Sequence, residues 1–137
     1  MFYLIYVSSA IKLMHDDELL LLLEKARENN SRLGITGMLL YKEGNFMQML
    51  EGEKKTVLEL YDAIKKDERH KDIVTIVSGD IKERNFENWT MGFYDMNKAG
   101  DFPRYDDYIK ENLTLKSFQD DSQFAYSFIT QFNEMNP

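Results

Sequence analysis

"GITGMLLYKEGNFMQMLEG", residues 34–52, is the stretch that decides the fold of this chain. It contains two apolar runs, at roughly residues 35–42 and 45–51, and each run is short enough to form a single strand. The KEGN sequence between the runs supplies the glycine that a tight turn needs. The stretch therefore predicts a β-hairpin, and the other elements are expected to surround it.

One polar residue interrupts the second strand of this hairpin. Alternation of side chains along a strand puts Gln48 on the same face as Phe46 and Leu50. A buried primary amide must find partners for two N–H donors and one carbonyl acceptor. The backbone at a β-bulge or strand end would be one source of partners. A bound polar ligand would be another.

The elements on either side of the hairpin predict an α+β fold. We expect a short buried strand at residues 3–8, a helix at 16–30 that opens with acids at the N-cap, and a helix with one apolar stripe at 54–67. Two further strands are expected at 72–81 and at about 89–96. The order βαββαβ, with one more strand, predicts a ferredoxin-like mixed sheet with two helices on one face.

A change of composition after residue 96 suggests a boundary between residues 1–96 and an extension at 97–137. We expect the extension to form one or two short helices on the other face of the sheet. Its aromatic residues suit either a plain stabilising cap or an output and oligomer surface. These residues are Phe118, Phe124, Tyr126, Phe128 and Phe132.

The composition argues against several classes of function. The 137 residues include 24 acidic and 17 basic ones, and a net charge of -7 disfavours binding to nucleic acid. There are no cysteines for disulfides or Cys-ligated metals, and the two histidines lack metal-site spacing. No stretch approaches the ~18 apolar residues of a membrane span, and no export signal is evident, so a cytoplasmic protein is expected.

Two more polar residues are expected near Gln48. At about 100° per residue, Asn30 points in the same direction as Leu19 on the apolar stripe of the first helix. Asn30 would otherwise be the last helical residue in a left-handed conformation, and Tyr6 a core ring with its hydroxyl at the rim. Leaving such groups unpaired would cost ~1–3 kcal/mol each. A planar heterocycle with an amide-like edge would satisfy all three residues.

At this point the chain resembles the BLUF family, the blue-light sensors that use flavin. The matching stretches keep the family's order and spacing and cover residues 1 to about 95. They are LIYVSSA, LLLLLEKARENNSRLGITGMLLYKEGNFMQMLEG, LYDAIKKDERH and RNFENWTMGF. The run N-x4-ITG-x-LLY-x2-G-x-F-x-Q-x-LEG is highly specific for the family.

The resemblance implies a noncovalently bound FAD between the two helices, with the polar edge of its ring toward the sheet. Tyr6 resembles the phenol that gives an electron, and then a proton, to the excited flavin. Gln48 resembles the switch amide that bridges this phenol and the flavin, and Asn30 the amide that holds the imide edge. Leu22 and Ile64 occupy positions suited to gripping the two faces of the ring.

Further residues follow from the same resemblance. Asn29, Arg69 and His70 are additional ligand candidates, although a helix-terminal role facing the dipole would also explain His70. Trp89 and Met91 match the segment that lies near the switch glutamine and relays the signal. FMN or riboflavin is expected to be tolerated in place of FAD, because no pyrophosphate-binding loop is recognisable.

The function that the resemblance implies is photoreception and not catalysis, with a red-shifted state that reverts in the dark. Since no effector domain fits before residue 137, we expect signalling in trans to a partner protein and assembly into dimers or larger oligomers. A ferredoxin-like module that binds a metabolite or partner without photochemistry is the alternative. An acylphosphatase-type enzyme is a third reading, but SSAIKLM at residues 8–14 has no arginine to cradle a phosphate.

Overall fold

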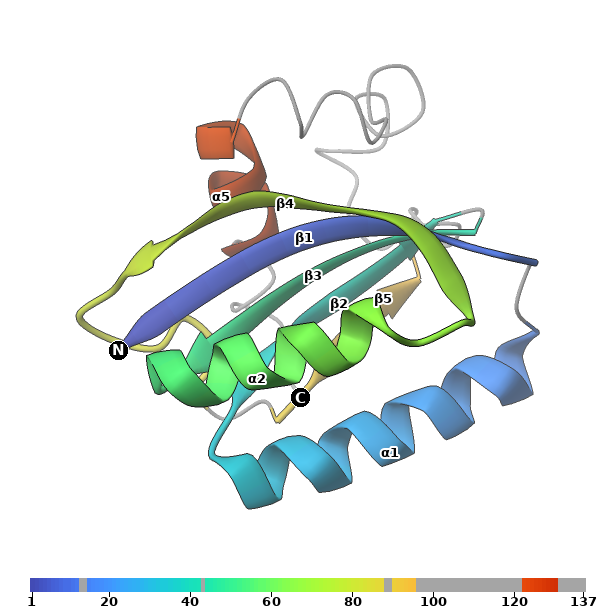
Figure 1. Cartoon of the computed structure of the whole chain (residues 1–137), viewed down its shortest axis with the longest axis horizontal. Helices are drawn as coiled ribbons and strands as arrows, with labels where there is room; N and C mark the ends of the chain where they lie inside the picture. Colours follow the sequence, from blue (N-terminus) through green and yellow to red (C-terminus); the bar gives the residue numbers. More distant parts are fainter. Residues whose placement is uncertain (13–14, 43, 88–89, 96–121, 131–137) are drawn as a thin grey trace.

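A five-stranded sheet forms the centre of the molecule (Figure 1), with α1 and α2 on one face and α5 on the other. The computed structural model describes residues 1–12, 15–42, 44–87, 90–95 and 122–130. The elements are β1 (Phe2–Ala10), α1 (Asp16–Leu33), β2 (Thr36–Lys42), β3 (Asn45–Gly52), α2 (Lys54–Lys65), β4 (His70–Asp80), β5 (Gly92–Asp95) and α5 (Ser122–Thr130).

The strand order β4-β1-β3-β2-β5 is that of a ferredoxin-like sheet with one added edge strand. Strand β1 pairs antiparallel with both β3 and β4, β2 pairs antiparallel with β3, and β5 joins β2 in parallel. The predicted mixed α+β architecture is confirmed. The division of function between residues 1–96 and 97–137 stays a prediction, since only residues 122–130 of the extension are described.

The hairpin forms where the sequence predicts it. Gly44 has a φ of 84° in the turn, a left-handed conformation that glycine adopts at little cost. Strands β2 and β3 then pair in an unbroken register from Thr36 opposite Glu51 to Lys42 opposite Asn45. Because β3 is regular along this pairing, the bulge considered for Gln48 is absent from it.

Helix α1 differs from its prediction at both ends. The N-cap is His15, whose backbone N–H donates to Glu18 Oε1 at 3.3 Å, so the acids lie in the first turn and not at the cap. The helix also continues past Asn30 to Leu33. Gly34, with a φ of 70°, is the left-handed residue that ends it, and the Gly34 N–H donates to the Asn30 carbonyl.

Two apolar cores lie on opposite faces of the sheet, because successive strand residues point to opposite sides. The core under α1 and α2 includes Tyr6, Leu50 and Met91, and the core under α5 includes Met47 and Met49. Of the five aromatic residues singled out in the extension, Phe128 is buried in this second core, and the Tyr126 ring packs against Tyr3 at 5.0 Å. Phe118 and Phe132 lie outside the described residues.

A carboxylate is completely buried near the end of β3. Both oxygens of Glu51 are used: Oε1 accepts from the Thr36 hydroxyl at 3.1 Å and the Phe86 N–H at 2.9 Å, and Oε2 accepts from the backbone and side-chain N–H groups of Asn85. The Asn85 side chain also donates to the Tyr126 hydroxyl of α5 at 3.2 Å. Glu51 therefore fixes the connection after β4 to the centre of the sheet.

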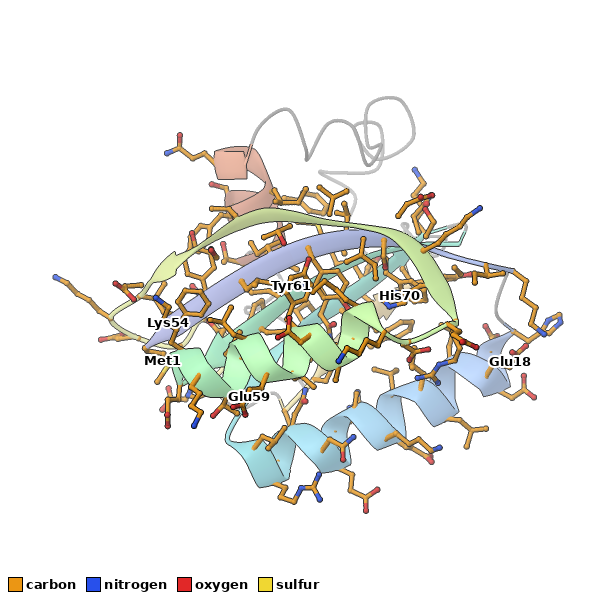
Figure 2. All side chains as sticks on the ribbon, viewed as in Figure 1. Met1, Glu18, Lys54, Glu59, Tyr61 and His70 are labelled. Carbon is orange, nitrogen blue, oxygen red and sulfur yellow. The ribbon has the colours of Figure 1, made fainter. Side chains whose placement is uncertain are left out.

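Replacing Glu51 with glutamine should strongly destabilise the fold. Four donors converge on two acceptor oxygens, whereas an amide offers one oxygen and would point its own N–H groups at two of these donors. We expect Glu51→Gln to lower the free energy of unfolding by about 3 kcal/mol in urea denaturation. Glu59→Gln, on the exposed side of α2 (Figure 2), is the matched control and should change it by under about 0.5 kcal/mol.

Gly37 marks a place where two strands and a side chain approach too closely for any Cβ. A Cβ there would lie 1.9 Å from the Met49 carbonyl oxygen and 3.4 Å from Met91 Cε. Gly37→Ala should therefore lower the free energy of unfolding by about 3 kcal/mol, because backbone would have to move. Gly79→Ala, whose Cβ would meet Tyr3 at an ordinary 3.5 Å, should cost much less. Equal losses for the two variants would refute this steric account.

Candidate functional site

A cavity of about 270 Å³ lies between the sheet and helices α1 and α2. All of the ligand residues predicted from the sequence line it, namely Tyr6, Leu22, Asn29, Asn30, Gln48, Ile64, Arg69 and His70. The remaining lining residues, which the sequence analysis did not single out, are Lys25, Ala26, Leu39, Phe46, Leu60, Ala63 and Asp67. The structure thus brings residues from β1, α1, β3, α2 and β4 to one site.

Tyr6 and Gln48 face each other inside the sheet-helix layer. They are direct partners in the β1–β3 register, and the Tyr6 hydroxyl donates a hydrogen bond to Gln48 Oε1. Gln48 Nε2 donates in turn to Met91 Sδ at 3.2 Å. Side chains, and not backbone groups, therefore satisfy the Gln48 amide, and the Tyr6 hydroxyl is not at the rim.

The environment keeps the Tyr6 hydroxyl protonated. Its side chain is only 4% exposed, and this burial raises the pKa of the phenol above its usual range. The nearby Tyr61 hydroxyl and Asp67 carboxylate raise the pKa further, because they disfavour a phenolate. The Tyr61 ring lies 5.3 Å from the Tyr6 ring, and its hydroxyl is hydrogen-bonded to Thr75 Oγ1 at 2.7 Å. Tyr6 thus carries a proton that is already shared with the Gln48 amide.

Asn30 lies on the buried face of α1, three residues before the helix ends, so the helix-terminal explanation of this residue is wrong. Its side chain is 2% exposed, and Nδ2 donates to the Thr90 carbonyl at 2.8 Å. Among the residues that the structure describes, no donor meets Asn30 Oδ1. A buried carbonyl oxygen in this state leaves a hydrogen-bond acceptor available to a ligand.

Met91 lies next to Gln48 and belongs to the segment that the sequence predicts to relay the signal. It is 1% exposed, and its backbone carbonyl accepts a hydrogen bond from Arg27 Nε at 2.9 Å. Trp89, the other residue predicted for this segment, lies outside the described residues.

His70 is the first residue of β4 and is not part of a helix. Its Nε2 lies 2.7 Å from the Ile64 carbonyl near the end of α2, and its Nδ1 lies 2.9 Å from Ser8 Oγ. Because a carbonyl only accepts, Nε2 must carry the proton. The helix-terminal role considered for His70 is therefore correct in one respect, because His70 contacts a carbonyl at the C-terminal end of α2. It makes this contact from the first position of a strand and not from the helix itself.

Three charged residues, Lys25, Asp67 and Arg69, are among those that line the cavity. Arg69 makes an ion pair with Asp67, whose Oδ1 also accepts from the Arg69 backbone N–H at 2.9 Å. The side-chain hydrogen bond from Arg69 is the main reason that the pKa of Asp67 falls to about 2. Arg69 is therefore already paired with a carboxylate, whereas Lys25 adds a second basic group that the sequence analysis missed.

The chemistry of the cavity fits a flat heterocycle with an amide-like edge. Leu22 and Ala26 of α1, together with Leu60 and Ile64 of α2, provide aliphatic walls, while Asn30 and Gln48 provide polar groups. In the described ranges, no group of three or more histidine or acidic side chains is placed to hold a metal ion. Across those same residues, no helix has the length and apolarity to cross a membrane.

The Asp67–Arg69 pair should make stability depend on pH in acid. The pKa of Asp67 falls from an ordinary 3.8 to about 2 in the folded protein, so its stabilising contribution is present above pH 3.8 and disappears as the pH falls toward 2. Asp67→Asn should lower the free energy of unfolding at neutral pH, and the gap from the wild-type value should close between about pH 4 and pH 2. A gap that persists at pH 2 in chemical denaturation would contradict this assignment.

Comparison with known proteins places this chain in a family. The family model described as sensors of blue light using FAD, BLUF, matches residues 1–92. Photoactivated adenylate cyclase subunit beta of Euglena longa is 33% identical over 130 residues, which are 94% of this chain but only 15% of that protein. Subunit alpha from Euglena gracilis is 42% identical over 81 residues, covering 59% of this chain and 8% of that protein.

Solved structures agree with these sequence matches. The ground state of BlsA superimposes with a TM-score of 0.79 at 28% identity, covering 98% of this chain and 89% of that one. A bacterial light-regulated adenylyl cyclase gives a TM-score of 0.73 at 29% identity, covering 96% of this chain and 36% of that one. The family match, the shared fold and a cavity suited to a flavin lead to one conclusion: this chain belongs to the BLUF family, the sensors of blue light that use FAD.

Proposed function

We propose that Tyr6, Gln48 and Met91 form the light switch of this sensor and that the cavity between α1 and α2 holds the isoalloxazine ring of FAD. The observation that carries the proposal is the buried chain of hydrogen bonds from the Tyr6 hydroxyl through the Gln48 amide to the Met91 thioether, at the wall of the cavity. Asn30, with a buried acceptor oxygen available, would hold the polar edge of the ring.

The bound flavin supplies absorption of blue light and an excited state that is a strong one-electron oxidant. Tyr6 is the residue placed to give up an electron, and its O–H proton already points at Gln48 Oε1. Its raised pKa keeps this proton in place in the dark, so the electron donor and the proton to be moved belong to one side chain.

The two ends of the Gln48 amide are held with unequal strength. Oε1 accepts from a phenol, whereas Nε2 donates to a thioether sulfur, which is a weak acceptor. If Tyr6 gives an electron to the excited flavin and its O–H proton follows through Gln48 Oε1, Tyr6 no longer donates to this oxygen, and only the Met91 contact then opposes a reorientation of the amide. The electron and the proton would both return to Tyr6 when the charges recombine. A reoriented or tautomerised amide presents different donors to the cavity, which accounts for a small reversible red shift without a covalent bond between the protein and the flavin.

The output of this switch is also part of the proposal. Two curated relatives of this chain are beta subunits of photoactivated adenylate cyclases, and the chain spans about 15% of the length of each. We infer a sensor module without catalytic residues of its own that passes its signal to an effector or partner protein. Signalling in trans, a dimer or larger assembly and a cytoplasmic location remain predictions. The non-photochemical alternative has no observation in its favour.

The experiment that tests the switch records absorption spectra of FAD-loaded protein in the dark, after a blue flash and during recovery. Wild-type protein should show a flavin band that shifts red and returns. Gln48→Leu should bind flavin but lose the shift, because leucine can neither accept from Tyr6 nor donate to Met91. Gln123→Leu, the same change at an exposed position of α5, is the control and should keep it.

Two results would decide against the proposal. A Gln48→Leu variant with the wild-type red shift would remove Gln48 from the switch. Protein that neither contains flavin nor takes up added FAD, or that binds flavin without any shift, would favour the module without photochemistry.

A further inference from the structure

The main chain at residues 90–91 is fastened to helix α1 by two side chains. Asn30 Nδ2 donates to the Thr90 carbonyl at 2.8 Å, and Arg27 Nε donates to the Met91 carbonyl at 2.9 Å. Arg27 and Asn30 are three residues apart, so they lie next to each other along one side of the helix. One helix face therefore holds two consecutive carbonyl groups of a segment that is 60 to 64 residues away in the sequence.

Arg27 differs from Asn30 in its relation to the cavity. Asn30 lines the cavity and is a candidate flavin ligand, whereas Arg27 is not among the lining residues. The hydrogen bond from Arg27 nevertheless ends on Met91, whose sulfur accepts from the switch amide of Gln48. Arg27 is thus connected to Gln48 through Met91, although Arg27 itself does not line the cavity.

Holding this backbone matters because the side chain that it carries is adaptable. Methionine has three rotatable side-chain bonds and fills irregular spaces, so its own packing specifies its position weakly. The thioether is also a weak acceptor, so the Gln48 contact alone does little to keep Met91 in place. When the Met91 main chain is fixed, fewer positions are accessible to its sulfur atom.

We propose that Arg27 is a positioning residue for the light switch: it fixes the Met91 main chain so that the thioether stays on the Gln48 amide. The proposal rests on the proposed function for its effect on light responses, but its structural core does not require flavin. Without the guanidinium, Met91 Sδ leaves Gln48 Nε2, and the dark orientation of the amide loses one of its two partners. The reoriented amide is then longer-lived, so recovery in the dark slows.

The first test uses flavin-free protein and NMR of methionine methyl groups labelled with carbon-13. The chain has 8 methionines, and the Met91 signal is assigned as the one missing from Met91→Leu. Arg27→Ala should move this signal and the side-chain amide signals of Gln48, while methyl signals of the core under α5 stay in place. Arg27→Leu keeps an aliphatic stem for packing and should give the same result.

Arg32→Ala is the matched control for this test. It removes an arginine from the same helix, but the Arg32 guanidinium donates within α1 to Asn29 Oδ1 at 3.2 Å and not to residues 90–91. The Met91 signal should therefore stay in place. A Met91 signal that is unmoved in both Arg27 variants, or that moves equally in Arg32→Ala, would overturn the proposal.

The second test measures dark recovery of FAD-loaded protein. Arg27→Ala should recover at least about threefold more slowly, since a hydrogen bond from a charged, exposed side chain to the carbonyl of buried Met91 is lost. Unchanged or faster recovery would overturn the effect on the switch. If wild-type protein shows no light response at all, the proposed function fails, whereas the methyl signals still decide whether Arg27 positions Met91.

Discussion

The antiparallel pairing of β1 with β3 is the constraint on which the rest of the site depends. It places Tyr6 directly opposite Gln48, on the face that α1 and α2 cover. A slip of one residue would send either side chain to the opposite face, under α5, and the hydrogen bond between them would be lost. The two apolar faces of β3 fix this register, while the hairpin turn at Gly44 fixes the separate register between β2 and β3. The geometry of the switch is thus a consequence of how the sheet is built.

Much of the fold follows from local patterns in the sequence. Two apolar runs around a glycine turn specify the hairpin, and helical spacing specifies α1 and α2, so the order of elements is enough to predict the sheet. Polar residues on apolar stripes also reveal Tyr6, Asn30 and Gln48, since each conflicts with its neighbours. The sequence predicts the end of α1 at Asn30, because Asn30 and Gly34 both suit a helix terminus. The backbone conformation shows that Gly34 is the left-handed residue that ends the helix.

Local sequence patterns do not predict the other contacts around the site, because the hydrogen-bonding partners are far apart in the chain. Glu51 follows the strand alternation and looks like a solvent-facing charge, yet its donors come from Thr36 and from residues 85–86. Arg27 likewise reads as an ordinary charge on a helix, and its acceptor lies 64 residues away. Spacing within one element carries no signal for contacts of this kind. They become visible only when the connection between β4 and β5 is placed against the sheet.

Within the described residues, that connection is held near its start and at its end, and this arrangement limits how a change at Gln48 spreads. Near its start, Asn85 and Phe86 donate to the buried Glu51 of β3, and at its end Arg27 and Asn30 of α1 hold residues 90–91. With both points fixed, a reoriented Gln48 amide displaces the Met91 side chain before it displaces any backbone. Asn30 also lines the cavity, so of these hydrogen bonds its bond to the Thr90 carbonyl should respond most directly to a change in the flavin. A signal that leaves this site through the main chain therefore has to loosen residues 90–91 from α1, while Glu51 keeps the start of the connection in place.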